Sequence, residues 1–290
     1  MKRILYISLL TCLLAACTKQ VPAPKEDFSR EGYTLLPANI ETLLLGDGTK
    51  RTWSEDAAIG VYGSTLGRNE RYLLRKADAG LENGEFYGPL VSGSVIAAYY
   101  PFAASVSGSA ESMNSYLSAS QSFTAGVEAQ EQFLGYCPTA YAFLSDGKLA
   151  FRYPCGILKV TVYLEETLHV LSVSLTDGAV PLAGPMYVTP AGASLDSALG
   201  SHTITLDCGA GIPTKDGSGK FQPFYLVLLA GDYSNLTLSV SIQEEAQPIV
   251  CPISSLRIPR IDASNFSMGA VTVQSGGPAS FEPVNVNFDE

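Results

Sequence analysis

Gly156-Ile-Leu-Lys-Val-Thr-Val-Tyr163 and His169-Val-Leu-Ser-Val-Ser-Leu-Thr176 are the two stretches that decide the fold. In both, apolar residues largely alternate with Ser, Thr or Lys at a period of two. A strand with one face in the core and one face in water needs this alternation, because successive side chains point to opposite faces of a sheet. We therefore predict two β-strands of a sheet with one buried face.

The same pattern extends outward over most of the chain. Gly, Pro, Asp or Asn interrupts the sequence about every eight to twelve residues, and apolar or alternating runs lie between the interruptions. The further predicted strands are 58–62, 94–102, 203–206, 224–229 and 236–242. Asp146-Gly147 between apolar runs predicts a hairpin turn at 145–148, and short helices are plausible only within 111–121 and 127–133. Many short strands without a long helical period predict an all-β chain built from β-sandwiches.

The N-terminus has the pattern of an export signal. Lys2 and Arg3 precede an apolar run, 4–14, which as a helix would rise only about 16 Å, half of a membrane's hydrocarbon core. Ala15-Ala16-Cys17 then resembles a lipobox, which predicts cleavage before Cys17 and acylation of its thiol and new amino terminus. The alternative is ordinary cleavage after a small-residue site. Thr18, in place of Asp, favours sorting to the outer membrane.

The chain length allows two domains. Removing residues 1–16 from the 290-residue chain leaves 274 residues. We predict a signal peptide at 1–16, a lipidated flexible tether at 17–32, an N-terminal sandwich at 33–150, a C-terminal sandwich at 151–274, and a hinge with one more extended segment at 275–290. In this last segment Val284, Val286 and Phe288 alternate, so it could pair at home or with a neighbour.

The composition excludes one class of partner. The chain is 46% hydrophobic and 16% charged, with a formal net charge of −10. No basic stripe is present to neutralise phosphates, so nucleic acid is not expected as a partner. A cell-surface role suits the composition better.

Six cysteines become four once Cys12 leaves with the signal peptide and Cys17 is acylated. The remaining four have apolar neighbours, so disulfides and buried free thiols both stay open, with three pairings available in the first case. They are Cys137, Cys155, Cys208 and Cys251. None forms a Cys-x-x-Cys pair, so no metal site is predicted.

No motif for catalysis stands out. His169 and His202 lack a metal-ligand context and are predicted to be strand-edge residues in water. Ser145 and Lys148 satisfy Ser-x-x-Lys only by flanking the predicted turn, and 215–220 is predicted to be a flexible loop rather than a phosphate or calcium site. Glu165-Glu166 and Glu244-Glu245 would form a glycosidase pair only if folding brought them close, and solvated edges are the default. We predict no enzyme, no cofactor and no metal.

Aromatic residues are the one ambiguous resource. Trp53 and the Tyr99-Tyr100 pair could stack on sugars or fill the cores of the sandwiches. Core packing is the favoured prediction.

Several phrases together, in order along the chain, resemble the fimbrillin family, the pilin-like lipoproteins of type V pili. The phrases are Thr49-Lys-Arg-Thr-Trp53-Ser-Glu-Asp-Ala-Ala-Ile-Gly-Val-Tyr62, Val95-Ile-Ala-Ala-Tyr-Tyr-Pro101, Ser120-Gln-Ser-Phe-Thr124, Phe151-Arg-Tyr-Pro-Cys-Gly-Ile-Leu-Lys159, Leu182-Ala-Gly184 and Asn265-Phe-Ser-Met-Gly269. The resemblance covers about residues 33–274. It implies two tandem transthyretin-like β-sandwich domains, with Greek-key-type antiparallel sheets, that assemble by strand exchange.

Carried over by position, the resemblance implies a removable N-terminal strand within 33–45, with Arg51 as the candidate cleavage residue. Arg51 could equally be a solvated turn residue. The candidate donor strand is the tail with Val284, Val286 and Phe288. A missing strand would leave unpaired backbone groups over an open core, which a neighbour's strand could fill.

The sequence therefore predicts a fimbrillin-like structural or adhesive pilus subunit at the cell surface, anchored to outer-membrane lipid through Cys17. Its expected partners are other pilus subunits by strand exchange, with surface glycans or proteins of host or bacterial cells as further candidates. The alternative is a lipid-anchored surface glycan-binding module. Stalk, tip and anchor subunits are not distinguished.

Overall fold

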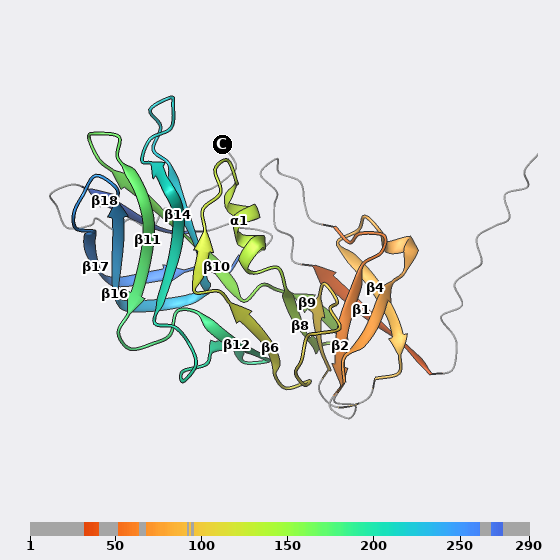
Figure 1. Cartoon of the computed structure of the whole chain (residues 1–290). Coiled ribbons are helices and arrows are strands. Elements are labelled where there is room, and N and C mark those ends of the chain that lie inside the picture. Colours follow the sequence, from red (N-terminus) through yellow and green to blue (C-terminus); the bar gives the residue numbers. More distant parts are fainter. Residues whose placement is uncertain are drawn as a thin grey trace, which may run out of the picture.

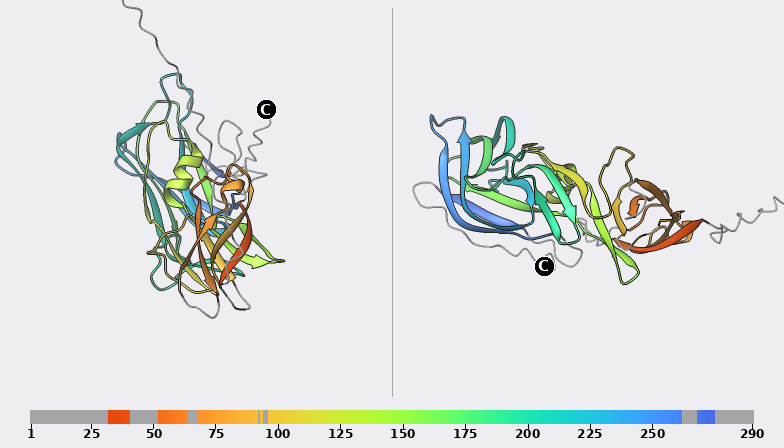
Figure 2. Two further views of the ribbon diagram at one scale, coloured as in Figure 1. Left: turned by 90° about the vertical axis from the view of Figure 1, so that its right-hand side faces the viewer. Right: turned by 90° about the horizontal axis from the view of Figure 1, so that it is seen from below.

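The computed structural model describes residues 32–40, 52–63, 68–91, 93, 96–261 and 268–274. Its regular structure is almost entirely β, which confirms the all-β prediction. The strands form two groups, one in orange tones and one running from green to blue (Figure 1). The groups follow one another along the long axis of the molecule (Figure 2).

The first group is a closed barrel with the strand order β1-β4-β3-β2-β5-β8-β9, in which β9 returns to β1. A short 3-10 helix, η1, covers Lys76–Asp78. The strands are β1 Tyr33–Ile40, β2 Ala58–Gly63, β3 Glu70–Leu74, β4 Asn83–Pro89, β5 Ile96–Tyr100, β8 Ala140–Ser145 and β9 Lys148–Phe151. A barrel has no free edge only while every strand is in place.

The hairpin between β8 and β9 has the predicted position. Ser145 lies opposite Lys148, and only Asp146 and Gly147 separate them. Both have positive φ, 51° and 74°, as a type I′ turn requires. Asp-Gly is favoured there because glycine, and to a lesser degree aspartate, tolerates left-handed backbone.

The barrel interior is filled by aromatic side chains that need small neighbours. Every residue of β2 is buried, and Gly60 of β2 lies opposite Tyr99 of β5. A Cβ at position 60 would stand 2.1 Å from the Tyr99 ring, so this strand pair closes only with glycine there. Trp53, 1% exposed, packs at the centre of the same core.

The second group contains three sheets, with the orders β15-β10-β18, β17-β16-β11-β14-β7 and β13-β12-β6. Its strands from the second half of the chain are β10 Cys155–Tyr163, β11 His169–Asp177, β12 Gly184–Thr189, β13 Gly192–Leu195, β14 Thr203–Pro213, β15 Pro223–Leu229, β16 Gly231–Ile242, β17 Ile249–Ile258 and β18 Gly269–Gln274. The two stretches that decide the fold are thus β10 and β11, which lie in different sheets.

Strand β11 departs from strict alternation through a bulge. The register with both neighbours shifts between Val170 and Ser172. Val170 and Val173 are therefore both fully buried, although three positions separate them. A bulge adds one residue to one strand, and here it keeps Ser172 out of the core.

Three elements from between β5 and β8 join the second group rather than the barrel. They are β6 Met113–Leu117, β7 Ser120–Ser122 and the α-helix α1 Ala129–Tyr136. Strand β6 pairs with β12, and β7 pairs in parallel with β14. Strand pairing thus crosses the boundary near residue 150 that the sequence suggested.

The two expected helices fared differently. The helix considered within 111–121 is wrong, because β6 and β7 occupy that stretch. The helix considered within 127–133 exists as α1, displaced toward the C-terminus.

Gln121 of β7 ties two sheets together. Its amide nitrogen donates to the Val227 carbonyl at 2.9 Å, and its amide oxygen accepts from the Val227 N–H at 2.9 Å. Val227 belongs to β15, whose other side pairs with β10. The fully buried Gln121 side chain therefore acts as one rung of a β-ladder between the sheets.

Replacing this rung is expected to destabilise the protein. Gln121→Leu keeps the volume but leaves a buried N–H and a buried C=O of Val227 without partners, at about 1–3 kcal/mol each. Ser120→Ala, on the exposed neighbour, is the matched control. Urea unfolding of both variants measures the difference, and a Gln121→Leu protein as stable as the parent would contradict this role.

Candidate functional site

Strand β1 closes the barrel and is the candidate site. It runs antiparallel to β4, from Tyr33 opposite Pro89 to Asn39 opposite Asn83. On its other side it is parallel to β9, with Ile40 beside Phe151. Without β1, both β4 and β9 would present unpaired backbone groups.

The side chains of β1 alternate strictly between core and surface. Leu36, Ala38 and Ile40 are buried, at 4%, 1% and 2% exposure, whereas Tyr33 and Leu35 are 47% and 39% exposed. Full burial of a Leu or Ile side chain is worth about 1.5–3 kcal/mol. The strand is therefore held by two such side chains and by backbone pairing on both sides.

Below β1, the seat of this strand is aromatic. Phe86 of β4 lies opposite Leu36, and the Trp53 ring meets Phe86 and Phe151 edge-on, with centroids 4.8 and 5.7 Å apart. Gly84 lies opposite Ala38, and a Cβ there would stand 2.5 Å from the Leu74 side chain. These contacts define what we call the β1 seat: the faces of β4 and β9 under Leu36, Ala38 and Ile40.

Polar groups cover the C-terminal end of the seat. The Asn39 amide donates to the Asn83 side-chain oxygen at 3.0 Å, and the Lys148 ammonium donates to the same oxygen at 2.9 Å. A cavity of about 290 Å³, lined partly by Pro37, Asn83 and Lys148, opens beside these groups.

The chain is fixed again immediately after the segment that follows β1. The Trp53 N–H donates to the Leu81 carbonyl at 3.0 Å, and the Gly80 N–H donates to the Trp53 carbonyl at 2.9 Å. A cut after Arg51 would therefore separate β1 from a body whose first residues are anchored at Trp53.

The predicted site residues divide into two sets. The strand expected within 33–45 is β1, Tyr33–Ile40. Cys17, Arg51, Val284, Val286 and Phe288 lie outside the described residues.

The aromatic residues considered for sugar stacking belong to the core. Trp53 is 1% exposed and Tyr99 is fully buried, as the favoured prediction has it. Tyr100 is half-buried and meets the Trp53 ring edge-on at 5.1 Å. Tyr116 and Tyr187, at 64% and 37% exposure, are exposed on β6 and β12 instead.

The groups considered for catalysis lie apart from the seat and serve local structure. His169 is a surface residue whose Nδ1 lies 2.6 Å from a Glu244 carboxylate oxygen. Its backbone N–H and its ring hold the pKa of Glu244 below the usual range. His202 Nδ1 lies 3.0 Å from the Asp177 carbonyl oxygen.

The loop at 215–220 is organised by one carboxylate. Asp216 accepts hydrogen bonds from the Ser218 hydroxyl and from the N–H groups of Ser218 and Lys220, which lower its pKa. The prediction of a loop is therefore right, but the turn is built around Asp216.

The four cysteines are free and buried. A hydrogen bond from the neighbouring Cys137 thiol, together with burial, raises the pKa of Cys155 well above its usual value. Burial also raises the pKa of Cys208 to about 12. Both groups are therefore thiols at neutral pH.

In the described ranges we find no group of three or more His, Cys, Asp or Glu side chains placed to hold a metal ion. The same ranges contain no helix with the length and apolar character needed to cross a membrane.

No protein-family model matches the sequence, and no curated protein matches it. Solved structures do match. A candidate cell adhesion protein from Bacteroides ovatus superposes with a TM-score of 0.50 at 14% identity, over 87% of this chain and 96% of that chain. The tip fimbrial protein Mfa3 from Porphyromonas gingivalis, truncated at its C-terminus, matches with a TM-score of 0.39 at 9% identity, over 77% and 81% of the two chains.

A fimbrial assembly protein from Parabacteroides distasonis matches with a TM-score of 0.35 at 9% identity, over 83% of this chain and 90% of that chain. The chain shares its fold with the Bacteroides ovatus protein. The structural neighbours are adhesion and fimbrial proteins, in agreement with the fimbrillin resemblance of the sequence.

Proposed function

We propose that this protein is a structural and adhesive subunit of a cell-surface pilus, without enzymatic activity. It is exported as a lipoprotein, held on the outer membrane by acylated Cys17, and joined to its neighbours by strand exchange. In this proposal a protease cuts after Arg51, β1 leaves, and the tail with Val284, Val286 and Phe288 of another copy takes its place.

The observation that carries the proposal is the position of β1. It is the first described strand, it closes the barrel, and its buried side chains Leu36, Ala38 and Ile40 are spaced two residues apart. The candidate donor residues have the same spacing. A donated strand would regain both the ladder hydrogen bonds and the burial in the β1 seat.

The lipid has a defined part in this proposal. Two or three acyl chains hold a protein on a membrane essentially permanently, since each buried CH₂ contributes about 0.8 kcal/mol. A cut after Arg51 removes Cys17 and β1 together. The lipid therefore retains the closed subunit until it is cut, and the cut couples release to polymerisation.

The proposal keeps the predicted division of the chain. It has a signal peptide at 1–16, a tether at 17–32, transthyretin-like sandwich domains at 33–150 and 151–274, and a hinge with donor strand at 275–290. The pairing of β6 and β7 with β12 and β14 supports treating the two domains as one assembly unit.

The mature N-terminus of protein from cells tests the proposal. Mass spectrometry is expected to find acylated Cys17 at the start of the membrane-bound form and Thr52 at the start of chains in sheared polymers. Polymers whose subunits still contain residues 33–51 would contradict it, because the β1 seat would then still be occupied.

A further inference from the structure

The tail of the chain repeats the pattern of β1 in one register. When Phe281 is placed at the position of Tyr33, the side chains that fill the core in β1 coincide with apolar residues of the tail. The coincident pairs are Tyr33 with Phe281, Leu36 with Val284, Ala38 with Val286, Asn39 with Asn287, Ile40 with Phe288, and Glu41 with Asp289. An aromatic residue, the polar Asn and the acidic residue thus recur, as well as the alternation.

This likeness specifies both direction and register for the donated strand. A tail that runs as β1 does is antiparallel to β4 and parallel to β9. Asn287 would then stand where Asn39 now donates to Asn83. Phe288 would stand beside Phe151, as Ile40 does.

The residue that follows Phe288 meets a cationic residue in this register. Arg152 follows Phe151 directly, and its backbone exchanges two hydrogen bonds of 2.9 Å with Tyr141. Phe151 is fully buried and Arg152 is exposed, so Arg152 lies on the outer face of the barrel. Asp289, next after an inward residue, also belongs to the outer face.

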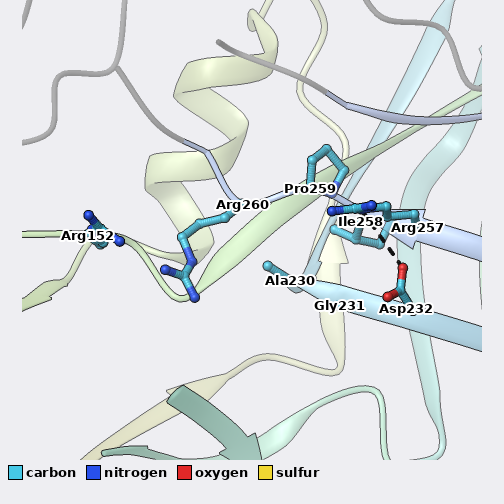
Figure 3. A pocket seen from close by; sticks show the side chains of 8 residues that line it. All are labelled: Arg152, Ala230, Gly231, Asp232, Arg257, Ile258, Pro259 and Arg260. Carbon is cyan, nitrogen blue, oxygen red and sulfur yellow. Dashed lines mark ion pairs between the residues drawn. The ribbon is translucent and has the colours of Figure 1, made fainter. Parts of the chain in front are cut away.

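Arg152 lies at one side of a cationic groove (Figure 3). This groove, of about 390 Å³, is also lined by Arg257, Arg260 and Asp232. Arg257 lies 3.9 Å from Asp232, and both side chains are more than 80% exposed. Figure 3 shows the Arg260 side chain lying between Arg152 and the end of β16. Three cations and one carboxylate leave the groove positive in a chain whose formal net charge is −10.

The charge of the tail is complementary to this groove. Residues 275–290 contain Glu282, Asp289, Glu290 and the terminal carboxylate, and no Lys or Arg. Opposite charges at the rim of an interface set register and speed association more than they add affinity.

We propose that the donated tail occupies the β1 seat parallel to β9, with Phe288 in the place of Ile40, and that Asp289 and Glu290 bind the arginine groove of Arg152 and Arg260. This inference rests on the proposed strand exchange and adds its direction, register and an ionic stop. The hydrophobic side chains alone permit a slip of two residues or a reversed strand, because both keep Val284, Val286 and Phe288 on the inner face. The groove selects one of these arrangements.

Cross-linking distinguishes the three arrangements. Tyr87 lies opposite Leu35, so the proposed register places Pro283 opposite Tyr87. A slip of two residues places Asn285 there, and a reversed strand centred on Val286 places Asp289 there. We therefore compare three double variants of the full chain, each with Tyr87→Cys: Pro283→Cys, Asn285→Cys and Asp289→Cys. After cleavage, only the first is expected to form intermolecular disulfides in high yield.

Polymers that cross-link through Asn285→Cys or Asp289→Cys instead would overturn the proposed register while leaving strand exchange intact. Cleaved protein that forms no polymer in any variant would count against the proposed function itself. The uncut protein of each variant is the control for disulfides formed without exchange.

Charge reversal tests the groove. At low salt, Arg152→Glu and Asp289→Arg are each expected to slow polymerisation roughly fivefold, and their combination is expected to restore most of the rate. Arg68→Glu is the matched control, because Arg68 is a 70% exposed arginine that pairs with Glu70 of β3, outside the groove. If the combined variant is as slow as either single variant, or if both single variants polymerise at the parent rate, the ionic stop is wrong.

Discussion

Cleavage after Arg51 is expected to convert the monomeric protein into polymer, and a disulfide between Leu35→Cys and Tyr87→Cys is expected to prevent this. Leu35 and Tyr87 lie opposite one another on the outer face of the barrel. Opposed residues of antiparallel strands have Cα atoms about 4.5–5.5 Å apart, within the range that a disulfide spans. The bond would hold β1 in its seat even after the chain is cut.

Size-exclusion chromatography with light scattering measures the result. The oxidised double variant should stay monomeric after cleavage, and a reductant should restore polymer growth. The native cysteines are all buried, so they are not expected to compete for the new bond. Leu35→Cys alone controls for the substitution, and Arg51→Ala should resist both cleavage and polymerisation. A locked, cleaved protein that polymerises at the parent rate would show that β1 does not have to leave.

Loss of the tail is expected to have an equally large effect. A chain without residues 276–290 should be cleaved normally yet form no polymer, since nothing would refill the β1 seat. A synthetic peptide of residues 276–290 should bind this cleaved protein and raise its melting temperature, because a ligand of the folded state stabilises it by mass action.

A pair of single substitutions sharpens this test. Phe288→Asp would place a carboxylate beside Trp53 and Phe151, where burial without a partner costs several kcal/mol. Asn285→Asp adds the same charge on the outer face and is expected to polymerise nearly as the parent does. Equal behaviour of the two variants, or polymer growth without the tail, would exclude residues 281–288 as the donor.

Local signals in the sequence predicted much of the fold. The turn at Asp146-Gly147 requires positive φ at two adjacent residues, and few dipeptides other than Asn-Gly and Asp-Gly supply it. The alternation in β10 likewise reports burial directly, since Val160 and Val162 are fully buried and Thr161 between them is not.

The sequence was misleading where two periods coincide. Met113 and Leu117 are the buried residues of β6. Their spacing of four residues fits one face of a helix as well as one face of a strand. What makes this stretch a strand is its partner β12, which lies far along the chain and leaves no local signal.

The candidate site was predicted in part. The alternation within 33–45 and the family resemblance together pointed to β1, and the aromatic seat follows from Trp53 and the Phe151 phrase. The arginine groove was missed. Arg152, Arg257 and Arg260 come from separate parts of the sequence, and only the packing of β16 and β17 against the end of the barrel brings them to one surface.

The excursion of β6, β7 and α1 into the second group has a mechanical consequence. The chain crosses between barrel and second group three times, after β5, after α1 and after β9. Tension along a fibre would therefore be divided among three covalent connections within each subunit. Such a subunit resists extension between its two halves, and a pulled fibre is expected to yield first at the non-covalent joints between subunits.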